Sequence, residues 1–169
     1  NFKLYRNSLE LSKDDFVEID KYCKELNIDW FCTVHDTESL DFIKEFKVPF
    51  YKVASMDSGN MSFVNDVAHT AKNNNAGLIV SLGGKDTKYV ENLVKNLEKF
   101  KINVHLLHTV SIYPTPIGQS NIFRIVELIE KFKKYNDWLQ IGYSGHEVGF
   151  SASTLALLYG AKMIERHFT

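Results

Sequence analysis

Two histidines near the carboxyl-terminal end of the sequence stand at matching places after two apolar runs. His146 follows the run "LQIGYSG", and His167 follows the run from Ala161 to Ile164. If these runs are neighbouring parallel strands, both imidazoles lie at the same rim of the sheet. Two neutral imidazoles can bind a divalent transition metal and leave positions open for water and substrate. The spacing therefore predicts a metal site at His146 and His167, although a purely structural role for the pair is an equally open alternative.

The remaining polar residues near these runs are interpreted from their place along the chain. Glu165 is expected to point the same way as His167, and Arg166 the opposite way, because side chains alternate along a strand. His69 lies within a predicted helix and His105 opens a predicted strand. Both are therefore interpreted as structural histidines.

Lys52 is a cation inside an apolar run, "FYKVAS". We expect its stem to lie among Tyr51 and Val53 and its ammonium group to reach the rim of the sheet. Convergent donors and one cation are what an anionic ligand such as a phosphate needs, and "SLGG" would let backbone N–H groups approach such a ligand closely. Polar turns are an alternative explanation for the serines and glycines, but they explain Lys52 less well. Short hydroxyl groups follow several other predicted strands: Ser55, Ser81, Ser111 and Ser144.

Short apolar runs alternate with amphipathic stretches along the whole sequence. The runs are continuously apolar, as in parallel strands that are covered on both faces, and one strand plus one helix takes about thirty residues. The first helical stretch spans 12–27, with Ser12 as its N-cap and Phe16, Tyr22 and Leu26 on its apolar face. The predicted strands are "WFCTVHD", "FYKVAS", "GLIVSLGG", "VHLLHTV", "LQIGYSG" and "MIERHFT".

This alternation predicts an α/β fold of the TIM (β/α)8-barrel type. About six βα units are present, and a full barrel takes about 250 residues, so the first two strands are expected to be absent. Residues 1–169 would then form a single partial barrel domain. A doubly wound open sheet is the structural alternative, because strand order cannot be derived from this one sequence.

The composition is that of an ordinary globular domain. Hydrophobic residues make up 44% of the sequence and the formal net charge is -1, which argues against a nucleic-acid partner. No apolar run reaches the length of about 18 residues that a membrane span needs, and no secretory leader is evident. We therefore expect a cytoplasmic protein with no membrane partner, in which Cys23 and Cys32 are reduced thiols.

Several motifs together carry a resemblance to a known family. They are "PFYKVAS", "VSLGG", "HTVSIYPTP", "IGYSGHEVGF" and "YGAKMIERHFT", in the family's order. Over nearly its whole length, the chain resembles the catalytic barrel of the NeuB-type sialic acid synthases. The resemblance implies a transferase of carbohydrate biosynthesis. Such an enzyme condenses phosphoenolpyruvate with N-acetylmannosamine or a related amino sugar to give a nonulosonic acid and phosphate.

The resemblance also implies roles for individual residues. A divalent metal, manganese or magnesium, would be held by the residues that match His146 and His167. Lys52, Asp57 and Tyr113 would be catalytic, with Asp57 as the acid that contacts the sugar. The residues implied to contact phosphoenolpyruvate are Thr33, Lys52, Ser55, Ser81, Ser111, Tyr113 and Ser144.

The chain departs from the family pattern at several positions. Gly145 stands where the family usually has an aspartate beside the first histidine, so a contact that orients this metal ligand is expected to be loosened. Asp57 replaces a common glutamate, Ser111 an asparagine, and Leu82–Gly84 a Thr-Gly-Met sequence, so an atypical sugar is expected. The C-terminal antifreeze-like (SAF) domain, which in relatives reaches the partner subunit of a homodimer, is expected to be absent from residues 1–169.

Three other functions stay open. Lys52 could be the nucleophile of a Schiff-base aldolase. The chain could belong to a related phosphoenolpyruvate-dependent aldol enzyme that makes a shorter keto-acid phosphate. A truncated barrel without catalytic activity could also bind a partner chain through unpaired edge strands at "WFCTV" and "MIERHF".

Overall fold

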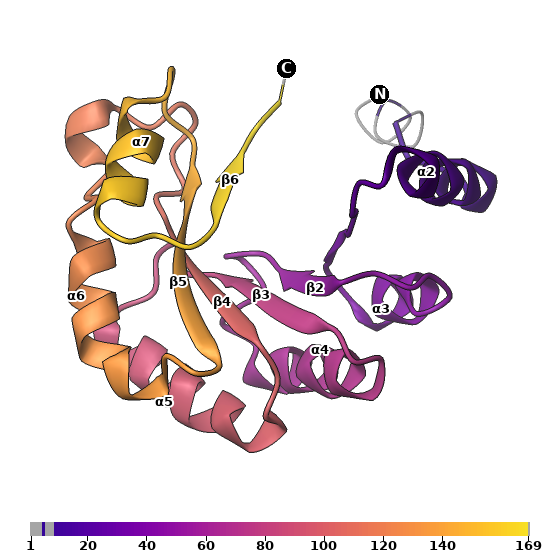
Figure 1. Ribbon diagram of the computed structural model, residues 1–169, viewed down its shortest axis with the longest axis horizontal. Coiled ribbons are helices and arrows are strands. Elements are labelled where there is room, and N and C mark those ends of the chain that lie inside the picture. The colour runs from indigo at the N-terminus through magenta and orange to yellow at the C-terminus, as the bar shows by residue number, and fades with distance from the viewer. Residues whose placement is uncertain (1–4, 6–8, 169) are drawn as a thin grey trace. The chain divides into compact units, whose positions relative to one another are not determined.

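The structure, a computed structural model, describes residue 5 and residues 9–168 (Figure 1). Contacts within the chain divide it into two compact units, residues 1–30 and residues 31–169. Among the described residues, the first unit contributes the helix α2 (Lys13–Leu26) and the second unit contains the sheet.

The helix α2 begins where the sequence predicts it. The Ser12 hydroxyl accepts a hydrogen bond from the backbone N–H of Asp15, and the Asp15 carboxylate accepts one from the backbone N–H of Ser12. This capping box satisfies donors that the first turn of a helix leaves unpaired. The predicted apolar face is only partly covered, because Tyr22 and Leu26 are 61% and 50% exposed.

Strands and helices alternate along the second unit. Most strands are shorter than predicted, and the first and the last differ most: the first has two residues, and the last begins at Ile164 rather than at Ala161. The helices are α3 (Thr37–Ile43), α4 (Met61–Asn73), α5 (Thr87–Leu97), α6 (Arg124–Phe132) and α7 (Ser151–Leu158), with short 3-10 helices η1 (Glu98–Phe100), η2 (Ile117–Gln119) and η3 (Lys133–Tyr135). The strands are β1 (Thr33–Val34), β2 (Phe50–Val53), β3 (Gly77–Ser81), β4 (Val104–Thr109), β5 (Leu139–Gly145) and β6 (Ile164–Arg166).

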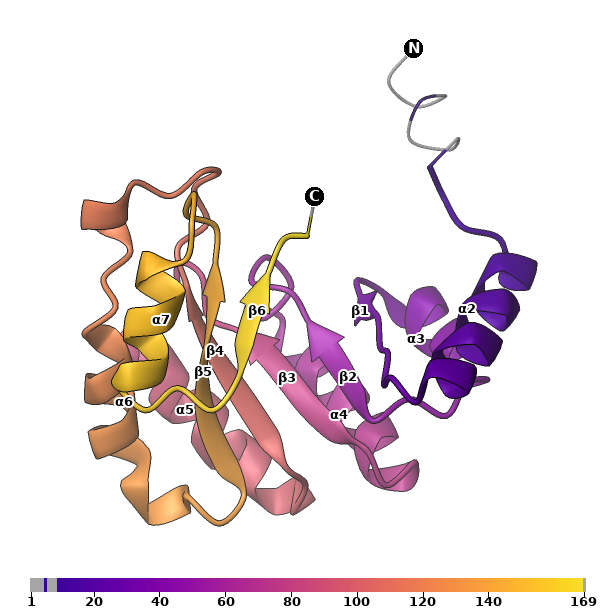
Figure 2. The same ribbon diagram turned by 45° about the horizontal axis from the view of Figure 1, so that its top comes forward.

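All the strands are parallel, and their order in the sheet, β1-β2-β3-β4-β5-β6, is their order along the chain. Figures 1 and 2 show that the sheet is curved and that α3 to α7 lie on its outer side. A doubly wound sheet would reverse its strand order and carry helices on both faces. That alternative is therefore wrong, and the second unit is a half-barrel of βα units.

Side chains alternate between the concave face of the sheet and the face covered by helices. The register puts Thr33, Lys52 and Ile79 in one row across β1, β2 and β3. Tyr51 and Val53 are buried on the opposite face, where Asn74 at the end of α4 donates a hydrogen bond to the Tyr51 hydroxyl. The expectation that the stem of Lys52 lies among Tyr51 and Val53 is therefore wrong, because neighbours along a strand point to opposite faces.

Aromatic side chains pack together near the amino ends of the central strands. The Phe50 ring lies edge-on to Phe31 at 6.0 Å and to His105 at 5.4 Å between ring centroids. Gly77 leaves room for this ring, since a Cβ at position 77 would lie 2.5 Å from Phe50 Cε1. His105 is thus a packing residue, as predicted, and burial lowers its pKa.

No helix in the described part of the chain has the length and apolar character needed to cross a lipid bilayer. Cys23 and Cys32 are both free thiols, as expected. Burial raises the pKa of the Cys32 thiol, which makes the reactive thiolate form less accessible.

The buried His108 predicts that stability depends on pH. It lies on the helix-covered face of β4, where its Nε2 is 2.9 Å from the backbone oxygen of Ser120. Burial lowers the pKa of His108, so the unfolded chain takes up a proton at a pH where the folded chain does not. The free energy of unfolding should therefore fall as the pH drops below about 6.5, by at most about 1.4 kcal/mol per pH unit for this one group.

Urea unfolding at about pH 7.5 and about pH 5.5 measures this effect in the native chain and in His108→Gln. The glutamine amide can still donate to Ser120 but does not titrate, so the variant should lose less stability in acid. An equal loss in both proteins would contradict the role of His108.

Candidate active site

A cavity of about 650 Å³ opens on the concave face at the carboxyl ends of the strands. It gathers every residue predicted to bind the metal or phosphoenolpyruvate, whereas Asp57 is not in its wall. Parallel strands explain this convergence, because all their carboxyl ends lie at one side of the sheet. The lining residues are Thr33, His35, Lys52, Ala54, Ser55, Met56, Ser81, Thr109, Ser111, Tyr113, Ser144, Gly145, His146, Glu165, Arg166 and His167.

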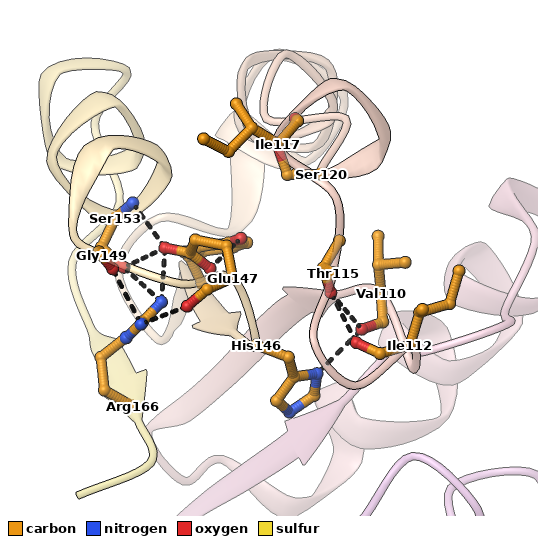
Figure 3. Close-up of polar contacts among 11 residues, drawn as sticks. Val110, Ile112, Thr115, Ile117, Ser120, His146, Glu147, Gly149, Ser153 and Arg166 are labelled. Carbon is orange, nitrogen blue, oxygen red and sulfur yellow. Dashed lines mark hydrogen bonds and ion pairs between the residues drawn. The ribbon is translucent and has the colours of Figure 1, made fainter.

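The two candidate metal ligands lie side by side, with 5.2 Å between the ring centroids of His146 and His167. His146 Nδ1 lies 2.8 Å from the backbone oxygen of Val110 (Figure 3). A carbonyl oxygen can only accept, so Nδ1 carries the hydrogen and Nε2 keeps its lone pair. This is the arrangement that orients metal-binding histidines in proteins.

The donor set at this place fits a divalent ion with open positions. Among the described residues, no group of three or more histidine, cysteine, aspartate or glutamate side chains is placed to hold a metal ion. Any metal held by His146 and His167 would thus have only these two ligands of that kind among the described residues, and other donors would have to complete its coordination. Such open positions are typical of catalytic rather than structural metal sites.

Tyr113 covers the histidine pair from the loop after β4. Its ring centroid lies 4.0 Å from that of His146 and 5.6 Å from that of His167, and the residue is 65% exposed. Thr115 fastens this loop: its backbone N–H donates to the backbone oxygen of His146 at 3.0 Å, and its hydroxyl donates to that of Ile112 at 2.8 Å. Tyr113 is thus held where it can contact a ligand bound at the histidines.

The concave face also carries an ion pair that joins distant strands. Lys52 Nζ in β2 lies 2.5 Å from Glu165 Oε1 in β6. As predicted, Glu165 lies on the same face as His167, in the cavity wall, while Arg166 points to the other side of β6 (Figure 3). Strand alternation predicts the direction of Glu165 but not its partner Lys52, which lies far away along the chain.

Hydroxyl groups meet around Gly83 beside Lys52. The backbone N–H of Gly83 donates to Ser55 Oγ at 3.0 Å. A Cβ at position 83 would lie 2.3 Å from Ser111 Oγ and 2.7 Å from Ser55 Oγ. Only glycine lets the two hydroxyls approach the backbone this closely; the predicted approach of backbone N–H groups to a ligand stays a prediction.

Thr109 is a cavity residue that the sequence analysis missed. It is 5% exposed and stands next to Ser144 in the β4–β5 register. Its buried hydroxyl oxygen has no hydrogen-bond partner among the described residues. Ser81 pairs with Leu107 across β3 and β4. Thr109 lies two residues after Leu107, so strand alternation places it on the same face as Ser81.

Asp57 lies beside the cavity and reaches it through His35. Its Oδ2 is 2.7 Å from His35 Nδ1. His35 lines both the main cavity and a neighbouring polar hollow of about 300 Å³, whose wall includes Asp57, Asn60 and Asp66. Asp57 is a predicted site residue, whereas no role is predicted for His35, because a single histidine after a strand is a weak signal.

The space beside Gly145 is filled by a carboxylate from another position, Glu147. Burial opposes its charge, but hydrogen bonds from its own backbone, from Ser153 and from Tyr143, together with the charge of Arg166, hold the pKa of Glu147 below its usual value. Burial, and then the nearby carboxylate, raise the pKa of the Tyr143 hydroxyl. The carboxylate next to Gly145 thus bonds to Tyr143, Ser153 and Arg166, whereas His146 is oriented by the backbone oxygen of Val110.

Comparisons with known proteins agree with this architecture. A sequence model of the NeuB family matches residues 2–169. The N-acetylneuraminate-9-phosphate synthase of Drosophila melanogaster is 37% identical over 166 residues, which cover 98% of this chain and 42% of that protein. The N,N'-diacetyllegionaminic acid synthase of Campylobacter jejuni is 32% identical over 165 residues, with 95% of this chain and 46% of that protein covered.

A solved structure has the same half-barrel. The crystal structure of the N-acetylneuraminic acid (sialic acid) synthetase of Leptospira borgpetersenii, in complex with citrate, matches with a TM-score of 0.83 at 31% identity. The match covers 95% of this chain and 53% of that one. The chain therefore spans about half the length of this protein and less than half the length of the two curated relatives.

The packing at Gly83 predicts how the cavity responds to one added methyl group. In Gly83→Ala the Cβ should displace the hydroxyls of Ser55 and Ser111. Loss of about one well-placed hydrogen bond would weaken the binding of inorganic phosphate about tenfold.

Isothermal titration calorimetry of phosphate binding checks this expectation. Gly118→Ala is the matched control, because a Cβ at position 118 meets no atom within 4 Å. Unchanged phosphate affinity in Gly83→Ala would show that the two serines do not bind the anion.

Proposed function

The chain belongs to the NeuB family, and we propose that it forms part of an enzyme that condenses phosphoenolpyruvate with an N-acetylmannosamine-like amino sugar. The products would be a nonulosonic acid and phosphate. The observation that carries the proposal is the cavity in which Lys52, a set of hydroxyl groups and two histidines converge. The names of the Drosophila and Campylobacter relatives, which are synthases of such acids, support the product class.

The active protein is proposed to be larger than this chain. In the described residues β1 and β6 form the edges of the sheet, and unpaired edges usually need a covering partner. Further βα units would close the half-barrel into an eight-fold barrel. A C-terminal antifreeze-like domain and a homodimer are part of the same proposal.

The ring of donors would hold phosphoenolpyruvate by its two anionic groups. Lys52 would supply the cation, and its ion pair with Glu165 keeps the ammonium group aimed into the cavity. Ser55 already accepts a hydrogen bond from Gly83, so its own hydrogen can be donated to the ligand. Donors fixed in advance need little rearrangement when charge develops. The other hydroxyl groups proposed for this task belong to Thr33, Ser81, Ser111 and Ser144.

His146 and His167 would hold a divalent ion, manganese or magnesium. The fit rests on the bond from His146 to Val110, which leaves the other ring nitrogen available. When bound, the ion would supply Lewis-acid polarisation of the sugar aldehyde. Tyr113, stacked over His146, would contact the substrate and limit the access of water.

In the proposed reaction, C3 of phosphoenolpyruvate attacks the aldehyde carbon of the open-chain sugar and forms the new carbon–carbon bond. The aldehyde oxygen takes up a proton and becomes a hydroxyl group. Water adds at C2 and loses one proton, which leaves a hydroxyl group there. The bond from C2 to the phosphate oxygen then breaks as this hydroxyl gives its proton to the departing phosphate, and the keto acid remains. Among the described residues, Glu165 is the only carboxylate in the cavity wall, so we assign it the proton from the water.

The sugar is proposed to lie on the side of the cavity where His35 and Asp57 form their pair. The Asp57 carboxylate can accept hydrogen bonds from sugar hydroxyls, and His35 extends the pair into the cavity wall. The Drosophila relative is named for a product with a phosphate at C9. Phosphoenolpyruvate contributes three carbons to such a product, so this phosphate would come from C6 of the sugar, and a 6-phosphate sugar belongs in any substrate panel.

A Schiff-base aldolase is the competing enzyme class. Its nucleophile must be an amine with a free lone pair, whereas Lys52 lies in an ion pair with Glu165. Borohydride reduction in the presence of a carbonyl substrate separates the two classes. A trapped covalent adduct on Lys52 would support the aldolase and contradict the synthase.

Phosphate release from phosphoenolpyruvate tests the proposal directly. We expect release only when an amino sugar and manganese are both present, and loss of release when a chelator is added. N-acetylmannosamine, its 6-phosphate and diamino analogues would form the panel. Phosphate release without any sugar would contradict the condensation, and no release with the whole panel would favour a barrel that lacks activity by itself.

Removal of one candidate ligand should abolish this turnover. In His167→Gln we expect the rate to fall at least about a hundredfold, the scale of losing one group that stabilises developing charge. His69→Gln is the matched control, because His69 lies in α4 and packs edge-on against Phe100. Activity that survives in His167→Gln and stays sensitive to the chelator would place the metal elsewhere.

A further inference from the structure

The β5–β6 ladder stops just short of the two candidate metal ligands. Its last two steps pair Ser144 with Glu165 and Gly145 with Arg166. Continued by one residue, the same register would place His146 opposite His167. The sheet itself therefore does not set the separation of the two imidazoles, and another interaction has to do so.

Beyond the last paired residues, the guanidinium group of Arg166 connects β6 to the segment that follows β5 (Figure 3). Nη2 donates to the backbone oxygen of Glu147 at 2.6 Å and to that of Gly149 at 2.9 Å, and Nη1 donates to Ser153 Oγ at 3.3 Å. Arg166 also forms an ion pair with the Glu147 carboxylate. The planar fork of arginine suits several fixed acceptors at once. One side chain of β6 thus holds the loop that begins at His146.

Glu147 is anchored from its other side by α7 and β5. Its side chain is fully buried, and its carboxylate accepts from the backbone N–H of Ser153 at 3.2 Å, from the Ser153 hydroxyl at 2.9 Å and from the Tyr143 hydroxyl at 3.0 Å. Ser153 lies in the first turn of α7, whose backbone donors have no partner within the helix. A carboxylate at this end is favoured by the helix dipole as well.

The packing around Gly145 leaves this arrangement little freedom. A Cβ at position 145 would lie 2.5 Å from Glu147 Oε2, 2.7 Å from Tyr143 Cε1 and 2.8 Å from Arg166 Nη1. The carboxylate, the phenol ring and the guanidinium group therefore close directly over the backbone of β5. They can do so only because position 145 has no side chain.

We propose that Glu147 and Arg166 are positioning residues for the histidine pair, and that their buried ion pair sets the separation of His146 and His167. Glu147 directly follows one histidine and Arg166 directly precedes the other. Fixing the side chain of Glu147 therefore restrains the backbone next to His146, and fixing Arg166 restrains the backbone next to His167. This inference rests on the proposed function in one respect only, namely that the ligand of the two histidines is a divalent metal.

The test compares the native 169-residue chain, or a longer protein that contains it, with Arg166→Met and with the milder variants Arg166→Lys and Glu147→Gln. Arg124→Met is the matched control. Arg124 is an arginine of similar exposure, 20% against 24% for the Arg166 side chain, and it bonds to Thr87 rather than to the histidine segments. Circular dichroism and thermal unfolding establish which variants are folded.

Two measurements report on the histidines themselves. In the metal-free protein, nuclear Overhauser contacts between the ring protons of His146 and His167 report their proximity. Calorimetric titration with manganese alone reports their affinity for metal. We expect Arg166→Met to lose the ring contact and to bind manganese about 10- to 100-fold more weakly, the usual effect of removing a group that orients a ligand. Arg166→Lys and Glu147→Gln should show smaller losses, and Arg124→Met none.

Folded variants that melt at a lower temperature but keep the ring contact and the manganese affinity would overturn the proposal, because the pair would then be structural only. If Arg166→Met does not fold, the two milder variants decide the question by the same readouts. A native protein that shows the ring contact but binds no manganese would contradict the metal assignment in the proposed function. The ring contact in the variants would still decide the positioning role.

Discussion

The curvature of the parallel sheet is the constraint on which the candidate site depends. Lys52 in β2 and Glu165 in β6 meet at 2.5 Å although β3, β4 and β5 lie between their strands. In a flat sheet, four steps between neighbouring strands would separate these positions by roughly 19 Å. Curvature therefore brings side chains from distant strands into one cavity, and the parallel direction ensures that these side chains come from the carboxyl ends.

The two ends of the concave face have different physical roles. At the amino ends, Phe50 and His105 pack against each other and contribute to the core. At the carboxyl ends, Ser144 and Thr109 are buried hydroxyl residues, and the Thr109 oxygen has no partner among the described residues. An unpaired buried hydroxyl costs about 1–3 kcal/mol. The carboxyl ends of the strands therefore carry polar groups that lower the stability of the fold, whereas the amino ends carry packed rings.

The elements could be derived from the sequence more completely than the site could. Apolar runs and the cap at Ser12 reflect local chemistry, and the matching positions of His146 and His167 follow from the parallel strands. The pairs Lys52–Glu165 and His35–Asp57 depend instead on how far the sheet bends and how its loops fold back. Strand alternation predicts the directions of Glu165 and Arg166 correctly. The same rule places Tyr51 and Val53 on the face opposite Lys52, contrary to the expectation for the Lys52 stem. The closed barrel and the metal remain predictions.

Gly145 has a consequence for how this sequence can change over time. Any side chain at position 145 would occupy the space of the Glu147 carboxylate, and Glu147 in turn neutralises Arg166. A single substitution at position 145 would therefore leave a buried charge without its partner, which is strongly destabilising. Positions 145 and 147 are therefore expected to change together, because a side chain at position 145 needs the space that the Glu147 carboxylate fills.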